Sequence, residues 1–221
     1  MDDAGWDHDY RQRGRLYGGG VRLPPVPEGA SVLELGCGDG RTLTALAARP
    51  GTVVGLDLSP AALALCRPAS GAAAPLLVRG DARRLPFRDG SFDAVLLLHV
   101  LGHGRADERH AMAAEAVRVT APGGRLHLRV FSREDLRAGA GREVEDGSRL
   151  RATGVLTHYF TEDEVASLFG SCRPLRLETV RWHLRVRGAD LLRAEIEGAF
   201  EPPAERARQG LTPGREEDQN T

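Results

Sequence analysis

The sequence contains no lysine, and all 30 of its basic residues are arginine. A lysine amine forms the Schiff base that anchors pyridoxal phosphate, and a lysine completes the Walker phosphate loop. Enzymes that depend on either device are therefore excluded.

Cysteine is also scarce. The three cysteines, Cys37, Cys66 and Cys172, lie far apart and form no Cys-x-x-Cys pair. Neither a disulfide framework nor a cysteine-rich zinc site is expected from this spacing. The seven histidines include no His-Glu-x-x-His motif, so we expect no metal site.

Long apolar runs are absent too. Runs such as residues 94–98 are far too short to cross a bilayer, and the polar N-terminus does not resemble a signal peptide. We therefore expect a cytoplasmic protein with no membrane partner.

Charge and length set the broad class. The 30 basic residues nearly balance 31 acidic ones, for a net charge of -1, which gives no overall attraction to nucleic acid. A chain of 221 residues with 41% hydrophobic content suits one α/β domain.

From residue 31 onwards, short apolar segments alternate with helical ones. This alternation predicts βαβ units and a doubly wound, mostly parallel sheet with helices on both faces. A further helix is expected to start at Ser59, a good N-cap followed by Pro60. We expect strands at 31–35, 52–56, 76–79, 92–98 and 125–131, and helices at 41–49 and 106–120.

The C-terminal third changes character. Thr161 and Glu164 form a capping box that predicts a helix to about residue 169. Residues 175–186 and 192–200 then alternate between polar and apolar, which indicates an antiparallel hairpin.

These patterns suggest a domain organisation. We expect an N-terminal arm or cap over residues 1–30 and the α/β domain over 31–200. An insertion without a clear period is expected at about 132–160. Residues 201–221 lack apolar content, which predicts a disordered tail.

The sharpest motif is a glycine-rich turn that follows the first strand. Gly36, Gly38 and Gly40 stand at alternate positions, where glycine permits a tight bend and close approach of a ligand. The dinucleotide fingerprint would need a third glycine at position 41, which is Arg41. The alternative interpretation is an ordinary tight turn between strand and helix.

Acidic residues end the next two strands. Asp57 closes the second strand, where a carboxylate can accept both hydroxyl protons of a ribose; alternatively, it is a charge that favours a helix start. Asp81 follows the third strand, where it can accept from an adenine amino group. The alternative there is an ordinary polar turn.

Taken in order, these motifs resemble those of class I S-adenosylmethionine-dependent methyltransferases. The resemblance covers roughly residues 31–131 and includes Ser-Phe-Asp-Ala-Val at 91–95 and Ala-Pro-Gly-Gly-Arg-Leu at 121–126. It implies a seven-stranded, Rossmann-like sheet whose last strand is antiparallel. It also implies S-adenosylmethionine as cofactor, with S-adenosylhomocysteine as product.

The resemblance also implies roles for individual residues. Asp57 would hold the ribose and Asp81 the adenine, while His99 would lie near the methyl group. An arm of this kind folds over the cofactor in some of these enzymes. The implied cofactor-binding residues are Tyr10, Glu34, Gly36, Cys37, Gly38, Asp57, Leu58, Asp81, Ala82 and His99.

An acidic acceptor would need a general base. His99 is the first candidate, followed by His103 and Tyr159; the alternative is that the histidines only pack or orient neighbours. We expect methyl transfer to nitrogen or oxygen of a small molecule. An RNA (tRNA) methyltransferase and a non-catalytic S-adenosylmethionine-binding protein remain as alternatives.

One strand carries the only support for RNA. Arg181, His183, Arg185 and Arg187 alternate, so that one face is basic. A solvated hairpin face is the preferred interpretation of this pattern.

Two segments are expected to cover the site. Residues 1–20 and 132–160 lie outside the βα units and carry aromatic residues that can wall a pocket. The alternative places the arm on the back of the sheet. These aromatic residues are Trp6, Tyr10, Tyr17, Tyr159 and Phe160.

Overall fold

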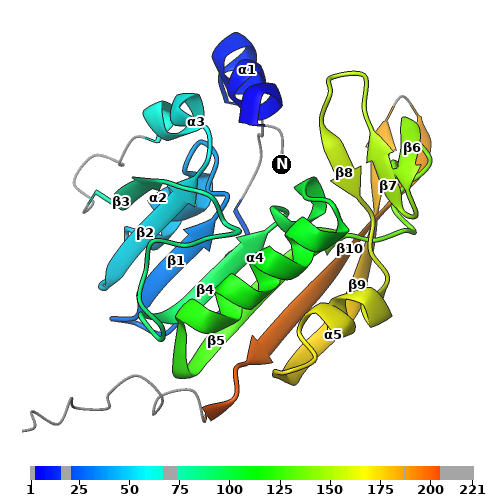
Figure 1. Ribbon diagram of the computed structural model, residues 1–221. Coiled ribbons are helices and arrows are strands. Elements are labelled where there is room, and N and C mark those ends of the chain that lie inside the picture. The colour runs from blue at the N-terminus through cyan, green and yellow to red at the C-terminus, as the bar shows by residue number, and fades with distance from the viewer. Residues whose placement is uncertain (1–2, 16–20, 67–73, 187, 205–221) are drawn as a thin grey trace, which may run out of the picture.

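The computed structural model describes residues 3–15, 21–66, 74–186 and 188–204. Its main feature is a seven-stranded sheet, shown in Figure 1. The strands are β1 (Ser31–Leu35), β2 (Thr52–Asp57), β3 (Leu76–Arg79), β4 (Phe92–Leu98), β5 (Thr120–Phe131), β9 (Arg173–Val186) and β10 (Ala189–Glu201).

The order of the strands is β3-β2-β1-β4-β5-β10-β9. Strands β1 to β5 pair in parallel, whereas β10 runs antiparallel to both β5 and β9. The predicted doubly wound sheet with a C-terminal antiparallel hairpin is confirmed.

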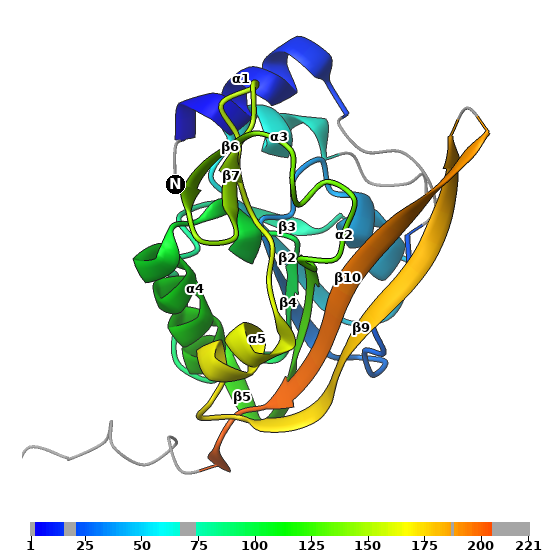
Figure 2. The same cartoon turned by 90° about the vertical axis from the view of Figure 1, so that its right-hand side faces the viewer.

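Helices lie on both faces of this sheet (Figures 1 and 2). The helices are α1 (Asp3–Arg13), α2 (Arg41–Leu46), α3 (Pro60–Leu65), α4 (Ala106–Val119) and α5 (Glu162–Leu168), with a 3-10 turn, η1, at Leu101–His103. Ser59 caps α3 as predicted, since its hydroxyl accepts from the Ala62 N–H at 3.1 Å. The predicted capping box of Thr161 and Glu164 opens α5.

Two predicted boundaries were wrong. Helix α2 ends at Leu46 rather than at 49, because the chain turns before Pro50 and Gly51. Strand β5 begins at Thr120 rather than at 125, because Thr120 already pairs with Phe92 of β4.

Alternation along the central strands builds a core on each face. Leu33 and Leu35 of β1 belong to the cluster that packs against α4. Val32 of β1 belongs to a second cluster with Leu43 and Leu46 of α2. Successive side chains of a strand point to opposite faces, so a strand buried on both faces is apolar throughout.

The insertion is more regular than the sequence suggested. It contains a three-stranded antiparallel sheet of β6 (Arg142–Glu145), β7 (Ser148–Leu150) and β8 (Leu156–His158). Strands of three or four residues are too short to show a period, which is why the sequence did not reveal them. Figures 1 and 2 show this sheet at the same end of the molecule as α1.

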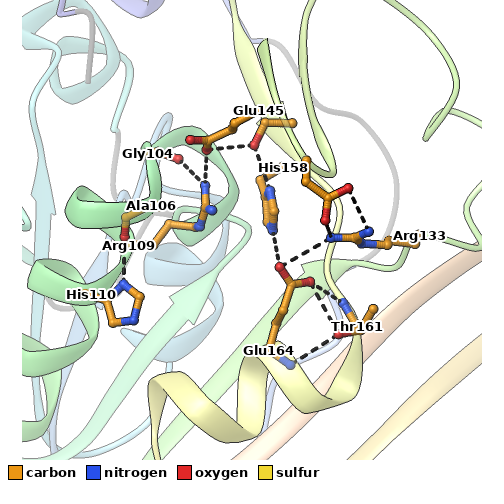
Figure 3. A network of polar contacts seen from close by, with 11 residues as sticks. Gly104, Ala106, Arg109, His110, Arg133, Glu145, His158, Thr161 and Glu164 are labelled. Carbon is orange, nitrogen blue, oxygen red and sulfur yellow. Dashed lines mark hydrogen bonds and ion pairs between the residues drawn. The ribbon is translucent and has the colours of Figure 1, made fainter. Parts of the chain in front are cut away.

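A network of polar contacts fixes the insertion to α4 and α5 (Figure 3). Arg109 of α4 donates to Glu145 at 2.7 Å, and Ser148 lies 2.9 Å from the same carboxylate. His158 lies 2.7 Å from the Ser148 hydroxyl through Nδ1 and 3.3 Å from Glu164 through Nε2. The insertion is thus bound to the domain by contacts that run from one helix to the other.

The chain ends beyond β10. The predicted disordered tail was placed from residue 201, but Glu201 still pairs with Arg173 in the hairpin and Pro202 is buried. Residues 205–221 lie outside the described residues. No helix in the described ranges is long and apolar enough to span a membrane.

We predict that Arg109→Ala lowers the free energy of unfolding by about 2–4 kcal/mol, because it leaves Glu145 without its cation in a partly buried place. His110→Ala is the matched control, since His110 is exposed on the same helix. Urea denaturation measures both. Equal losses in the two variants would show that the network does not stabilise the fold.

Candidate active site

A cavity of about 1030 Å³ opens at the carboxyl ends of the parallel strands. Residues of α1 and of the β9–β10 hairpin complete its walls. Ligands of doubly wound sheets bind at this edge. All ten residues predicted to bind cofactor line the cavity: Tyr10, Glu34, Gly36, Cys37, Gly38, Asp57, Leu58, Asp81, Ala82 and His99.

The turn after β1 requires glycine. Gly36 and Gly38 have positive φ of 66° and 56°. A Cβ on Gly36 would lie 2.6 Å from Val100 Cγ2, and one on Gly38 would lie 2.5 Å from the Tyr10 hydroxyl. The turn therefore brings bare backbone to the cavity, directly under α1.

Asp57 holds this turn in place. Its Oδ2 accepts from the Gly38 N–H at 2.8 Å, and its Oδ1 accepts from the Ser59 N–H at 2.8 Å. Asp57 thus organises the turn and lines the cavity at the end of β2.

Asp81 is more heavily engaged. The Arg83 side chain donates to both of its oxygens, at 2.6–3.0 Å, and the Arg83 N–H donates to Oδ1 at 2.9 Å. These bonds hold the pKa of Asp81 below its ordinary value. Arg83 also pairs with Glu108 of α4. Asp81 therefore faces the cavity as a fixed, ionised group with little accepting capacity left.

Two acidic side chains of the cavity wall have unsatisfied oxygens. Glu34 and Asp39 are each 4% exposed, and one carboxylate oxygen of each makes no hydrogen bond to the described residues. Burial raises the pKa of Glu34 to about 8, despite a hydrogen bond from Thr42 that lowers it. An orphaned acidic oxygen in a cavity wall favours a ligand that brings a cation or a donor.

Helix α1 lies against the cavity. Asp7 accepts from the Ser59 hydroxyl at 2.8 Å and from the Ala61 N–H at 3.0 Å, which fixes α1 to the start of α3. Trp6 meets His103 edge to face, with ring centroids 4.6 Å apart. The helix thus bridges from the β2 side of the cavity to η1. Tyr17 lies outside the described residues.

His99 stands where β4 ends. Its φ of 69° is the one positive value at a non-glycine residue within the described ranges. Its ring stacks on Phe131 at 4.5 Å, and its Nε2 lies 3.7 Å from Glu195. Burial, and then the arginines Arg129 and Arg137 among other cations, lower the pKa of His99 to about 3. His99 is therefore neutral at pH 7 and a weak base.

The other two candidate bases, His103 and Tyr159, differ in whether they reach the cavity. His103 lines the cavity, and because its Nδ1 lies 2.8 Å from the Leu156 carbonyl, Nδ1 carries the proton and Nε2 the lone pair. Burial lowers its pKa to about 4. Tyr159 is fully buried, accepts from Arg151 at 2.7 Å and is not among the lining residues.

Several walls of the cavity were not predicted from the sequence. Beyond His99 the walls come from β5, from the insertion and from the hairpin. The hairpin face opposite to Arg181 was the overlooked signal, because Val180, Trp182 and Leu184 alternate there. The other members that the sequence did not indicate include Arg129, Phe131, Arg137, Arg193 and Glu195.

The basic face of β9 is largely neutralised. Arg181 donates twice to Glu134, at 2.6 Å, and Arg185 pairs with Asp190 at 3.3 Å. Arg187 lies outside the described residues. Paired charges on an exposed hairpin agree with a solvated face.

Fold and cavity together define a class. The strand order with an antiparallel β10, the glycine turn after β1 and an acidic residue at the end of β2 are those of a Rossmann-like methyltransferase fold. Residues 33–128 match the family model described as a methyltransferase domain. The resemblance to class I S-adenosylmethionine-dependent methyltransferases is confirmed.

Individual relatives agree with this class. A fatty-acid O-methyltransferase of Mycolicibacterium smegmatis is 41% identical over 99 residues, 44% of this chain and 35% of that protein. A tRNA N(3)-methylcytidine methyltransferase of Drosophila melanogaster is 27% identical over 190 residues, 78% of this chain and 58% of that protein. The chain thus spans about a third of the first relative and over half of the second.

A solved structure supports the fold over a longer span. An S-adenosylmethionine-dependent methyltransferase of Methanosarcina mazei has a TM-score of 0.66 and 24% identity. The match covers 82% of this chain and 99% of that one.

We predict that Glu34→Gln stabilises the ligand-free protein increasingly as pH rises from 4.5 to about 8. The raised pKa means that folded Glu34 keeps a proton that the unfolded chain releases, so the wild-type residue costs stability over this window. The gain is on the order of a few kcal/mol at its upper end.

Melting temperatures at several pH values test this. The exposed Glu28→Gln variant is the control, and it should show no such pH-dependent gain. A constant difference between Glu34→Gln and wild type would mean that Glu34 is ionised throughout.

Proposed function

We propose that the protein is an S-adenosylmethionine-dependent methyltransferase that acts on nitrogen or oxygen of a small molecule. The observation that carries this proposal is the cavity above the glycine turn, walled by Glu34, Asp57 and Asp81 at the ends of successive strands. The match of residues 33–128 to a methyltransferase domain supports it.

The cavity residues fit this cofactor. The glycine turn and the unsatisfied oxygens of Glu34 and Asp39 suit the cationic methionine part. Asp57, in the cavity wall at the end of β2, would hold the ribose. For the adenine, Asp81 would have to share its bonds with Arg83, so the neighbouring Ala82 backbone is the better candidate.

When bound, the cofactor supplies an electrophilic methyl group on a sulfonium, a good leaving group. The protein's own task is to position the acceptor and exclude water. Trp6 and Tyr10 of α1 close the cavity above the glycine turn. We propose that residues 1–30 act as a cap on the domain formed by residues 31–200, with the insertion near 132–160 adding to the walls.

An acceptor with an acidic proton needs a base. Glu195 is better suited than His99, because burial raises the pKa of Glu195, whereas it lowers that of His99 to about 3. A base works best when its pKa approaches the working pH. We therefore propose that His99 orients the acceptor, and that Glu195, 3.7 Å away, accepts its proton.

Methylation of RNA is the second candidate. The likeness to the tRNA methyltransferase over 78% of this chain favours it. The pairing of Arg181 with Glu134 and of Arg185 with Asp190 speaks against it, as does the net charge of -1. Binding of tRNA that weakens steeply with salt would support this alternative.

We predict that S-adenosylhomocysteine binds, raises the melting temperature and displaces a proton at pH 7. Glu34, protonated when free because its pKa is about 8, should ionise beside the ligand's amino group. Calorimetry in buffers of different ionisation enthalpy measures the proton, and Glu34→Gln should release none.

Absence of binding at millimolar concentration, or a preference for NAD, would contradict the proposal. Binding without turnover of any acceptor in a metabolite screen with labelled methyl donor would instead favour a non-catalytic binding protein.

We predict that Asp7→Ala weakens S-adenosylhomocysteine binding ~10-fold, because it removes the two hydrogen bonds that hold α1 over the cavity. His8→Ala, exposed on the same helix, is the control. Unchanged affinity and kcat in Asp7→Ala would mean that α1 does not serve as a cover.

A further inference from the structure

The half of the cavity beyond His99 has an apolar, partly aromatic wall. Phe131 of β5 lies beside Glu195 of β10, which pairs with Val180 of β9. Trp182 and Leu184 continue the same face of β9. Leu184 remains 43% exposed, so a ligand lying on this wall would cover apolar surface that water now contacts. In Figure 2 this part of the hairpin extends past the neighbouring strands.

A buried carboxylate holds two arginines beside the wall. The side chain of Asp135 is 0% exposed, and its two oxygens accept from the Nε atoms of Arg137 and Arg193, each at 2.8 Å. The Arg137 guanidinium lies 4.1 Å from the centroid of Phe131, and that of Arg193 lies 5.4 Å from Trp182. Both guanidinium groups are therefore fixed against aromatic faces.

The contacts of Asp135 with Arg137 and Arg193 leave N–H donors of both guanidinium groups for a ligand. Asp135 engages both arginines through Nε, so their terminal nitrogens are the donors that remain for a ligand. Arg137 Nη2 has no hydrogen-bond partner among the described residues. A guanidinium held in one plane matches a carboxylate with two parallel hydrogen bonds.

The charges of this region do not balance. Each carboxylate pairs with or lies near at least one arginine, yet one positive charge remains without a counterpart. A ligand with a single negative charge would complete the set. The four arginines are Arg22, Arg129, Arg137 and Arg193, and the three carboxylates are Asp135, Glu195 and Glu197.

We propose that the half of the cavity beyond His99, called here the acceptor chamber, binds the methyl acceptor. We further propose that it selects a planar aromatic molecule that carries one carboxylate group. The aromatic body lies on Trp182 and Leu184, beside Phe131, and the carboxylate binds Arg137 and Arg193. The acceptor atom then faces His99 and Glu195. This inference rests on the proposed methyl transfer, because it assigns the chamber to the second substrate.

The test uses the full-length protein saturated with S-adenosylhomocysteine. Calorimetry compares benzoate, 3-phenylpropionate and 2-naphthoate with their neutral amides, with phenyl phosphate and decanoate as further probes. We expect at least one aromatic carboxylate to bind ~10-fold more tightly than its amide, and more tightly than phenyl phosphate or decanoate. Equal binding within every pair, or no binding at all, would overturn the proposal.

Two arginine variants test which residue produces the preference for the carboxylate over the amide. Arg193→Met should bring the carboxylate-to-amide ratio close to one, whereas Arg181→Met, on the outer face of the hairpin, should keep the wild-type ratio. An unchanged ratio in a folded Arg193→Met variant would overturn the assignment. The comparison in the wild type stands even if that variant fails to fold. Failure of S-adenosylhomocysteine itself to bind would count against the proposed function instead.

Discussion

The site depends on the carboxylate of Asp57. One oxygen receives the Gly38 N–H and the other the Ser59 N–H, so a single side chain ties the turn after β1 to the start of α3. Ser59 in turn donates to Asp7, which extends the same chain of hydrogen bonds to α1. Asp7 also receives the N–H of Ala61. The floor and the cover of the cavity are therefore held by one continuous set of bonds that starts at the end of β2.

Local patterns sufficed to predict the central sheet, and the family resemblance indicated ten residues that the structure brings to one cavity. Strand β1, the glycine turn and the Ser59 cap each depend on neighbouring residues, and all ten predicted cofactor residues line one cavity. The acceptor half could not be predicted in this way. Asp135 meets Arg193 across 58 residues of sequence, and the register between β9 and β10 decides that Trp182 faces inward. The alternation of Val180, Trp182 and Leu184 defines one face of β9, but the groups that this face meets on β5 and β10 follow from strand pairing across the sheet.

His99 shows how a single position joins these two halves. A side chain with positive φ is held at a cost of about 1–2 kcal/mol. Its N–H donates to the Arg129 carbonyl at 2.7 Å, and its ring stacks on Phe131, so β5 maintains the strained conformation. The same neighbours, with the arginines around them, keep the imidazole neutral. The residue at the junction is consequently rigid and uncharged at neutral pH.

The cavity is polarised about this junction. The half proposed for the cofactor is walled by carboxylates, and the half proposed for the acceptor has an excess of arginine. A ligand with a cationic end is therefore directed to the carboxylate half, and a ligand with an anionic group to the arginine half. If the two ligands exchanged places, each would meet like charges. In the proposed arrangement their reactive ends meet at neutral His99. In the proposed reaction a nucleophile approaches a positive centre and charge is neutralised, so water, which stabilises separated charges, would retard it. An apolar wall, a neutral junction and a helix that covers both serve that single requirement.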